Sequence, residues 1–172
     1  MENTFLITKC MLLPSEGSSL QEEFDITLGN PIIDYYESVE SPSISMTITF
    51  IDIDQLIGRK GITGGEYIDL IVKTGEGEDA EDFKITHDKQ RMVLNSVRNM
   101  VTESNKQVAT LEFVSVETLV NETARVNKKY TGNISDIVAE LLVGDTKGIQ
   151  TAKTLFGPED EDLGEDKIKK DR

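Results

Sequence analysis

The stretch Ser43–Ile53, SISMTITFIDI, decides the fold class of this chain. Its apolar side chains recur at every second position, and small polar side chains stand between them. Such a period of two is typical of a β-strand with one buried face. Near its end the polar side turns apolar, at Ile51 and Ile53, so both faces are expected to be covered there. The two sides of the strand are Ile44, Met46, Ile48 and Phe50, with Asp52 in line with them, against Ser45, Thr47, Thr49, Ile51 and Ile53.

Extended segments are predicted on both sides of this stretch. Prolines at positions 31 and 42 flank one of them, and the residue before a proline disfavours helix. Residues 91–102 fit either a helix or a strand that forms a hairpin with the next segment. The further predicted strands are 4–13, 21–28, 32–39, 67–73, 83–86 and 106–116.

These segments predict a mainly β body over residues 1–116, built as one antiparallel β-barrel or strongly curved sheet of six or seven strands. Alternation assigns a core face to several strands. The predicted core residues are Phe24, Ile26, Ile44, Met46, Ile48, Phe50, Leu70, Leu111 and Phe113.

Beyond residue 116 the apolar spacing becomes helical, so the chain is α+β overall. One helix is predicted within 115–126. A second is predicted over 134–143, with Asn133 at its start and Gly144 at its end, and is expected to pack beside the strands through Ile137, Val138 and Leu141. A single helical turn is also predicted after Asp54. The predicted domains are a barrel over 1–116, a helical appendage over 117–144 and a charged linker or disordered tail over 145–172.

Length and composition limit the class of protein. A chain of 172 residues suits one domain with an appendage. Its apolar runs fall short of the ~18 residues that a membrane helix needs, and its N-terminus lacks the features of a signal peptide. The single cysteine, Cys10, has no partner for an internal disulfide, which fits a reducing compartment. We expect Cys10 to be a core residue and the chain not to insert into membranes.

The charge balance argues against specific nucleic-acid binding. The chain has 32 acidic and 18 basic residues, a formal net charge of −14. Proteins that bind nucleic acids need clustered lysine and arginine to neutralise phosphates. Aromatic residues make up 6% and tryptophan is absent, so a base-stacking surface is not expected. The acidic surface is interpreted as a solvated one or as one that must not hold an anionic molecule.

No motif in the sequence predicts catalysis, a metal or a cofactor. His87 is the only histidine, which is too few for a zinc site or a serine triad of the usual kind. The turn Gly61–Glu66, GITGGE, lacks the Gly-Lys-Ser/Thr ending of a phosphate-binding loop. Acidic pairs leave a small hydrolase with two carboxylates as a rival hypothesis. These pairs are Glu22–Glu23, Asp52 with Asp54, Glu78–Asp79 and Glu81–Asp82.

The order of several short motifs points to a family. Over residues 4–150 the chain resembles the N-terminal part of baseplate hub proteins of contractile-tailed bacteriophages, which form the ring between the tail tube and the spike. Hub proteins are usually longer, with a second barrel after the helices, so this chain is expected to be a fragment or a split hub. The motifs are DYYESVESPSISMTI (34–48), ITGGE (62–66), LEFVS (111–115), YTGNISDIV (130–138) and DTKGIQ (145–150).

The resemblance implies a β-barrel of the tail-tube type and a homo-oligomer, expected to be a trimer with two barrels per chain. It implies tail tube and spike proteins as partners, a place in the virion after synthesis in the host cytoplasm, and a channel through which DNA passes. An acidic channel wall would keep the DNA from adhering.

Independently of the resemblance, segment 31–42 has the composition of a subunit boundary. It carries more apolar anchors than one core face can bury. Tyr35 and Tyr36 are adjacent, so they point to opposite faces of an extended strand, and one of them needs cover from a neighbour. The rival hypothesis is a β-sandwich adaptor that stays monomeric. The interface candidates are Ile32, Ile33, Tyr35, Tyr36 and Val39, together with the turn Gly64, Gly65 and Glu66, which is expected to adjoin the same boundary.

Overall fold

The computed structural model describes residues 5–41, 43–53, 55–74, 81–86, 90–103, 106–123, 125 and 129–143. The chain divides into two compact units, 1–118 and 119–172. The first unit contains the sheet, and the second contains the last helix. Each unit is described by itself.

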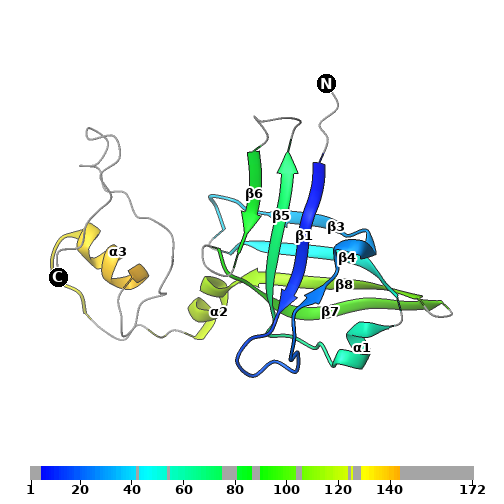
Figure 1. The fold of residues 1–172 in the computed structure, drawn as a ribbon. Helices are drawn as coiled ribbons and strands as arrows, with labels where there is room; N and C mark the ends of the chain where they lie inside the picture. Colours follow the sequence, from blue (N-terminus) through cyan, green and yellow to red (C-terminus); the bar gives the residue numbers. More distant parts are fainter. Residues whose placement is uncertain are drawn as a thin grey trace. The chain divides into compact units, whose positions relative to one another are not determined.

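The described residues form eight strands and four helical segments (Figure 1). The sequence left either a helix or a strand open for residues 91–102, and the structure has a strand there. The strands are β1 (Phe5–Leu13), β2 (Phe24–Asp25), β3 (Ile32–Tyr36), β4 (Ser45–Ile53), β5 (Tyr67–Thr74), β6 (Glu81–Ile85), β7 (Met92–Glu103) and β8 (Lys106–Ser115). The helical segments are the 3-10 turn η1 (Thr27–Gly29) and helices α1 (Leu56–Lys60), α2 (Val116–Thr123) and α3 (Ile134–Val143).

All strands belong to one antiparallel sheet with the order β2-β1-β5-β7-β8-β4-β3, in which β6 also pairs with β5. Strand β5 changes neighbour along its length. Its start pairs with β7 through Tyr67 and Val93, and its later part, from Leu70 to Thr74, pairs with β6. The sheet bends at this change, so β1, β5 and β6 cross over β3, β4, β7 and β8 (Figure 1). The core lies between these two layers.

The sheet is not closed into a barrel, so the prediction of a closed β-barrel is wrong. In the described part of the chain, β2 and β3 end the strand order without pairing with each other. Segment η1 runs between them instead. It passes so close to β4 that a Cβ on Gly29 would lie 2.8 Å from the carbonyl oxygen of Ile51, so glycine is required there. A backbone turn therefore covers the place where strand pairing would close a barrel.

The predicted strand over 21–28 is wrong except at Phe24–Asp25. The reason is local hydrogen bonding by side chains. The Asp25 carboxylate accepts a hydrogen bond from the backbone N–H of Thr27 (2.8 Å), and the Thr27 hydroxyl accepts one from the N–H of Cys10 (2.8 Å). The Thr27 hydroxyl thus accepts the hydrogen bond from β1 that a backbone carbonyl of a longer β2 would accept. The backbone at Thr27 can therefore turn and need not continue the strand.

The predicted core is confirmed. All nine core residues derived from the alternation are buried, from 0% exposure at Ile48 to 7% at Phe24. Cys10 is also fully buried, as expected, and burial raises the pKa of its thiol to about 12. Further buried residues come from β1, β5, β6 and β7, namely Leu12, Ile68, Ile85, Met92 and Leu94.

Helix α1 is positioned by a buried carboxylate. Asp52 is 2% exposed, and its Oδ2 accepts hydrogen bonds from the N–H of Ile57 and from Nε2 of Gln107, both at 2.8 Å. Asp52 therefore supplies the oxygen at the start of α1 that the sequence assigned to Asp54, which lies outside the described residues.

The two later helices match their predicted places, at 116–123 and 134–143. Neither contains a buried residue, and the packing of α3 beside the strands stays a prediction. No helix among the described residues is both long and apolar enough to cross a bilayer. The predicted linker or tail over 145–172 lies outside the described residues.

Candidate assembly interface

Strand β3 ends the sheet and carries four of the predicted interface residues. It pairs with β4 along one edge, and its other edge has no strand neighbour among the described residues. Ile33 and Tyr35 pack against the core. Ile32 and Tyr36 lie on the outer face, where they are 65% and 61% exposed. An edge strand with apolar outer residues is open to association.

Tyr35 fixes the inner side of β3 to the opposite layer. Its ring lies edge-on to that of Phe83 in β6, with centroids 5.2 Å apart. Its hydroxyl accepts a hydrogen bond from Gln90 (2.7 Å) and donates one to Glu37 (3.0 Å). Burial raises the pKa of Tyr35; the Gln90 bond opposes this shift, and Glu37 adds to it. Side chains, rather than strand pairing, thus join β3 to β6.

The residues at the end of β3 form the first surface, which we name the loop end and define as Tyr36, Glu37, Val39 and Glu40. Val39 is fully exposed. A shallow depression of about 310 Å³ adjoins this surface, lined by Tyr35, Tyr36, Glu37 and the serines at 38, 41, 43 and 45. The loop end therefore combines two exposed apolar side chains with two carboxylates.

A second apolar surface lies at the other end of the same layer, on its outer face. We name it the hairpin patch, because the hairpin of β7 and β8 forms part of it. Its strands align in register: Ile51 is opposite Val108, and Val108 is opposite Val101. The sequence predicted cover over Ile51 and Ile53, yet they are 39% and 52% exposed in this chain. The hairpin patch consists of Ile32, Ile51, Ile53, Val101 and Val108.

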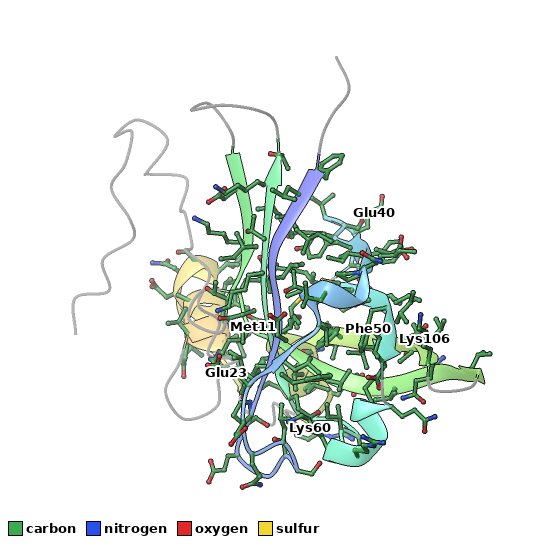
Figure 2. The ribbon with its side chains drawn as sticks, turned by 45° about the vertical axis from the view of Figure 1, so that its right-hand side comes forward. Met11, Glu23, Glu40, Phe50, Lys60 and Lys106 are labelled. Carbon is green, nitrogen blue, oxygen red and sulfur yellow. The ribbon has the colours of Figure 1, made fainter. Side chains whose placement is uncertain are left out.

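One described cation, Lys106, lies beside the hairpin patch. Lys106 is opposite Ile53 in the register. Helix α1 ends in Arg59 and Lys60, and Nζ of Lys60 lies 5.8 Å from the ring centroid of Phe24 in β2. Figure 2 shows Lys106 well apart from Glu40 of the loop end. The loop end thus carries two carboxylates, and the hairpin patch adjoins the ammonium group of Lys106.

An apolar groove of about 490 Å³ opens on the inner side of the sheet. Strands β1, β5 and β6 supply most of its wall, and Ile33 of β3 borders it. Phe5 at its rim is 65% exposed. The lining is Phe5, Ile7, Ile33, Leu70, Val72, Thr74 and Phe83.

The turn Gly64–Glu66 lies away from β3. The cross-strand row Tyr36, Ser45, Val114, Val93 and Tyr67 runs over five strands, about 19 Å along the sheet at ~4.8 Å per strand. The N–H of Gly65 donates to the carbonyl of Leu94 (2.8 Å), so this turn is bound to β7 of its own chain. Glu66 is 0% exposed and offers no surface to a neighbour.

Glu66 carries a buried carboxyl group. Neither of its carboxylate oxygens has a hydrogen-bond partner among the described residues. Burial raises the pKa of Glu66, and the nearby backbone N–H groups of Glu66 and Gly64 oppose the rise. Its backbone carbonyl accepts a hydrogen bond from Leu94 (2.7 Å) where the two layers join. Burial of the charged form of this carboxyl therefore costs free energy, and the group lies at the bend of the sheet.

Two of the carboxylates considered for hydrolysis have other partners. Asp52 is engaged with α1, and Asp82 forms an ion pair with Lys84 (2.8 Å) that lowers the pKa of Asp82. No group of three or more possible metal ligands occurs within the described ranges. His87, Asp54 and Glu78–Asp79 lie outside those ranges.

Sequence reasoning missed Val101 and Val108 as surface residues. Their alternation was visible, but the structure of 91–102 was ambiguous, and only the strand register brings them beside Ile51. No protein family, no curated protein and no solved structure matches this chain.

Proposed function

We propose that this chain is a structural subunit of a phage tail baseplate hub. In this proposal it assembles into a ring, most simply a trimer, that joins the tail tube to the central spike and leaves a channel for DNA. The observation that carries the proposal is the loop end. Tyr36 and Val39 are exposed at the end of an edge strand whose inner residues are packed in the core.

Exposed apolar residues in this arrangement are typical of an interface. Tyrosine is enriched at interfaces because its ring buries area while its hydroxyl keeps a hydrogen-bond partner. Native proteins ordinarily protect edge strands with charges, prolines or a covering element. Strand β3 has Asp34 on its outer face between Ile32 and Tyr36, but both apolar neighbours remain open. In a ring, a neighbouring subunit covers these two apolar residues.

The tail-tube type of the fold is part of this proposal. A curved antiparallel sheet with free edges suits the wall of a ring, because adjacent subunits can continue or cover those edges. The net charge of −14 supports a channel that repels DNA and does not retain it. The chain has no catalytic role in this proposal, and its place is the virion.

The proposal is tested by the assembly state of the purified chain. Light scattering after size-exclusion chromatography and native mass spectrometry should give one closed oligomer, expected to be a trimer. Electron cryo-microscopy of that oligomer should place residues 31–42 at the subunit boundary and acidic side chains on the channel wall. A chain that stays monomeric at its highest soluble concentration, or a basic channel wall, would contradict the proposal.

The apolar groove favours a second candidate, a monomeric adaptor that binds a partner. Its volume of about 490 Å³ lies within the range of ligand sites, roughly 300–1,000 Å³. An adaptor would bind an apolar segment between β3 and β6 without forming a ring. The substitution Val72→Lys would abolish such binding and leave a ring that is formed through the loop end unchanged.

A further inference from the structure

We infer that Glu66 is a pH-sensitive switch at the bend of the sheet. Its neutral carboxyl group keeps the connection between the two layers closed, and its ionisation opens that connection. We name this place the joint and define it as Gly64, Gly65, Glu66 and Leu94. The inference concerns the fold of one subunit and does not depend on the proposed ring.

The joint lies where strand pairing passes from one layer to the other. Among the described strands, the layers have one pairing link, that of β5 with β7, and its register contains the single pair Tyr67 and Val93. Two backbone hydrogen bonds adjoin this pair. The N–H of Gly65 donates to the carbonyl of Leu94 (2.8 Å), and the N–H of Leu94 donates to the carbonyl of Glu66 (2.7 Å). Loss of these two bonds therefore loosens the link and leaves the pairing within each layer intact.

The carboxyl group of Glu66 makes the joint sensitive to pH. The residue is 0% exposed, and neither carboxylate oxygen has a hydrogen-bond partner among the described residues. An ionised carboxylate in such a place has lost its hydration without gaining a counter-charge. Burial raises the pKa of Glu66, and the backbone N–H groups of Glu66 and Gly64 oppose the rise. The charged form regains water when the joint opens.

The charged side chains on the elements around the joint have other partners or are exposed. Arg98 of β7 pairs with Glu112 (2.9 Å), and Lys9 of β1 pairs with Asp69 (2.9 Å). The opposition to the raised pKa of Glu66 accordingly comes from backbone N–H groups, not from a described cation. The remaining charged groups are Lys60, whose ammonium group lies over the ring of Phe24, Asp52, which binds the start of α1, and the exposed Glu16, Arg59 and Arg91.

The turn before Glu66 can open without unfolding the sheet. Gly64 and Gly65 have φ angles of +144° and +95°, and neither has a side chain that packs. The hydroxyl of Ser15 donates a hydrogen bond to the carbonyl of Gly65. Opening thus breaks this bond and the two bonds to Leu94, whereas β5 keeps its pairing with β1 and β6, and β7 keeps its pairing with β8.

The direction of the pH effect follows from the two forms of the joint. At low pH the carboxyl is protonated in both forms, and the closed form has its full stability. As the pH rises, the open form ionises first, because its carboxyl has an ordinary pKa. The fraction of open joint then increases until the pH exceeds the pKa of the closed form. The total increase is about tenfold for each unit by which the pKa is raised.

Hydrogen exchange of the full chain, followed by NMR from pH 4.5 to 8, measures this opening. The protection factors of the Gly65 and Leu94 N–H groups should fall as the pH rises and then become constant. Low concentrations of urea distinguish local from global opening. Exchange at these two groups should depend little on urea, whereas the core strand residues Ile48 and Leu111 should be more protected and strongly urea-dependent.

Two variants assign the effect to one carboxyl. Glu66→Gln should make the protection of Leu94 independent of pH. Asp69→Asn is the matched control, since it removes a carboxylate of the same region of β5, and its joint should keep the pH dependence. If Glu66→Gln does not fold, the carboxyl carbon shift of Glu66 in the unchanged chain gives the same information, and its titration midpoint should lie above that of an ordinary glutamate.

Three results would overturn the inference. One is a protection of Gly65 and Leu94 that does not change with pH in the unchanged chain. Another is a urea dependence at the joint equal to that of Ile48 and Leu111, which would mean that the joint opens only with the whole fold. The third is a pH dependence that persists in Glu66→Gln, or an ordinary titration midpoint of Glu66. None of these results bears on the assembly state, so the ring proposal is decided by its own test.

Discussion

Tyr35 and Tyr36 are neighbours in β3, yet their side chains lie on opposite faces of the sheet. Tyr35 packs against the core and bonds to Gln90 and Glu37, whereas Tyr36 is 61% exposed. The alternation of an extended strand produces this division. The strand can therefore be held by its own subunit through one tyrosine and present the other to a neighbour.

The hydroxyl of Tyr35 should stabilise the fold. Tyr35→Phe removes the hydrogen bonds to Gln90 and Glu37 and keeps the ring contact with Phe83, so we expect a loss of about 1 kcal/mol in the free energy of unfolding. Urea denaturation of the two proteins measures the difference. Tyr36→Phe is the matched control, since the exposed ring leaves its hydroxyl to water, and its midpoint should not change.

The carboxyl of Glu66 should make stability depend on pH. Its pKa is raised in the folded state, so its neutral form is the one that the fold favours. The stability associated with Glu66 is complete below its unfolded pKa and is lost as pH rises through the folded pKa. Glu66→Gln keeps the shape without the charge, so at pH 7–8 we expect this variant to be more stable than the unchanged chain.

Denaturation over pH 4 to 8 tests this expectation. The advantage of Glu66→Gln should shrink as the pH falls towards the unfolded pKa of an ordinary carboxyl group. Parallel stability profiles for the two proteins would show that Glu66 does not titrate in this way.

The carboxylate of Asp52 should hold α1 at the end of β4. Asp52→Ala leaves the N–H of Ile57 and the amide of Gln107 without this acceptor in a buried place. The loss is expected to be about 2–4 kcal/mol, since hydrogen bonds to charged groups contribute about 1.5–3 kcal/mol each and partly overlap here. Hydrogen exchange should show faster opening of α1. Unchanged exchange there would mean that α1 does not depend on Asp52.

The thiol of Cys10 should be inert in the folded protein. The side chain is completely buried, so neither water nor a reagent reaches the thiol. Its pKa of about 12 leaves almost no thiolate near neutral pH. We expect a thiol reagent at pH 8 to label the chain only after urea is added, with labelling that follows the unfolding transition. Rapid labelling without urea would show that β1 opens readily.

The sequence by itself determined the type of most elements and the side of each strand that is buried. The alternation in Ser43–Ile53 assigned Met46, Ile48 and Phe50 to the core, and the helical spacing after residue 116 located α2 and α3. Such periods are local, because they record which side of one element meets water. The division between Tyr35 and Tyr36 follows from the same rule.

Only the tertiary structure decided how these elements combine. The pairing of Tyr67 with Val93 bends the sheet, and the Thr27 hydroxyl that bonds to Cys10 ends β2 where alternation predicted a longer strand. The hairpin patch arises because register brings Val101 and Val108 beside Ile51, which is fifty or more positions away in the sequence. Contacts between distant segments depend on the free energy of the whole fold, so no local period in the chain encodes them.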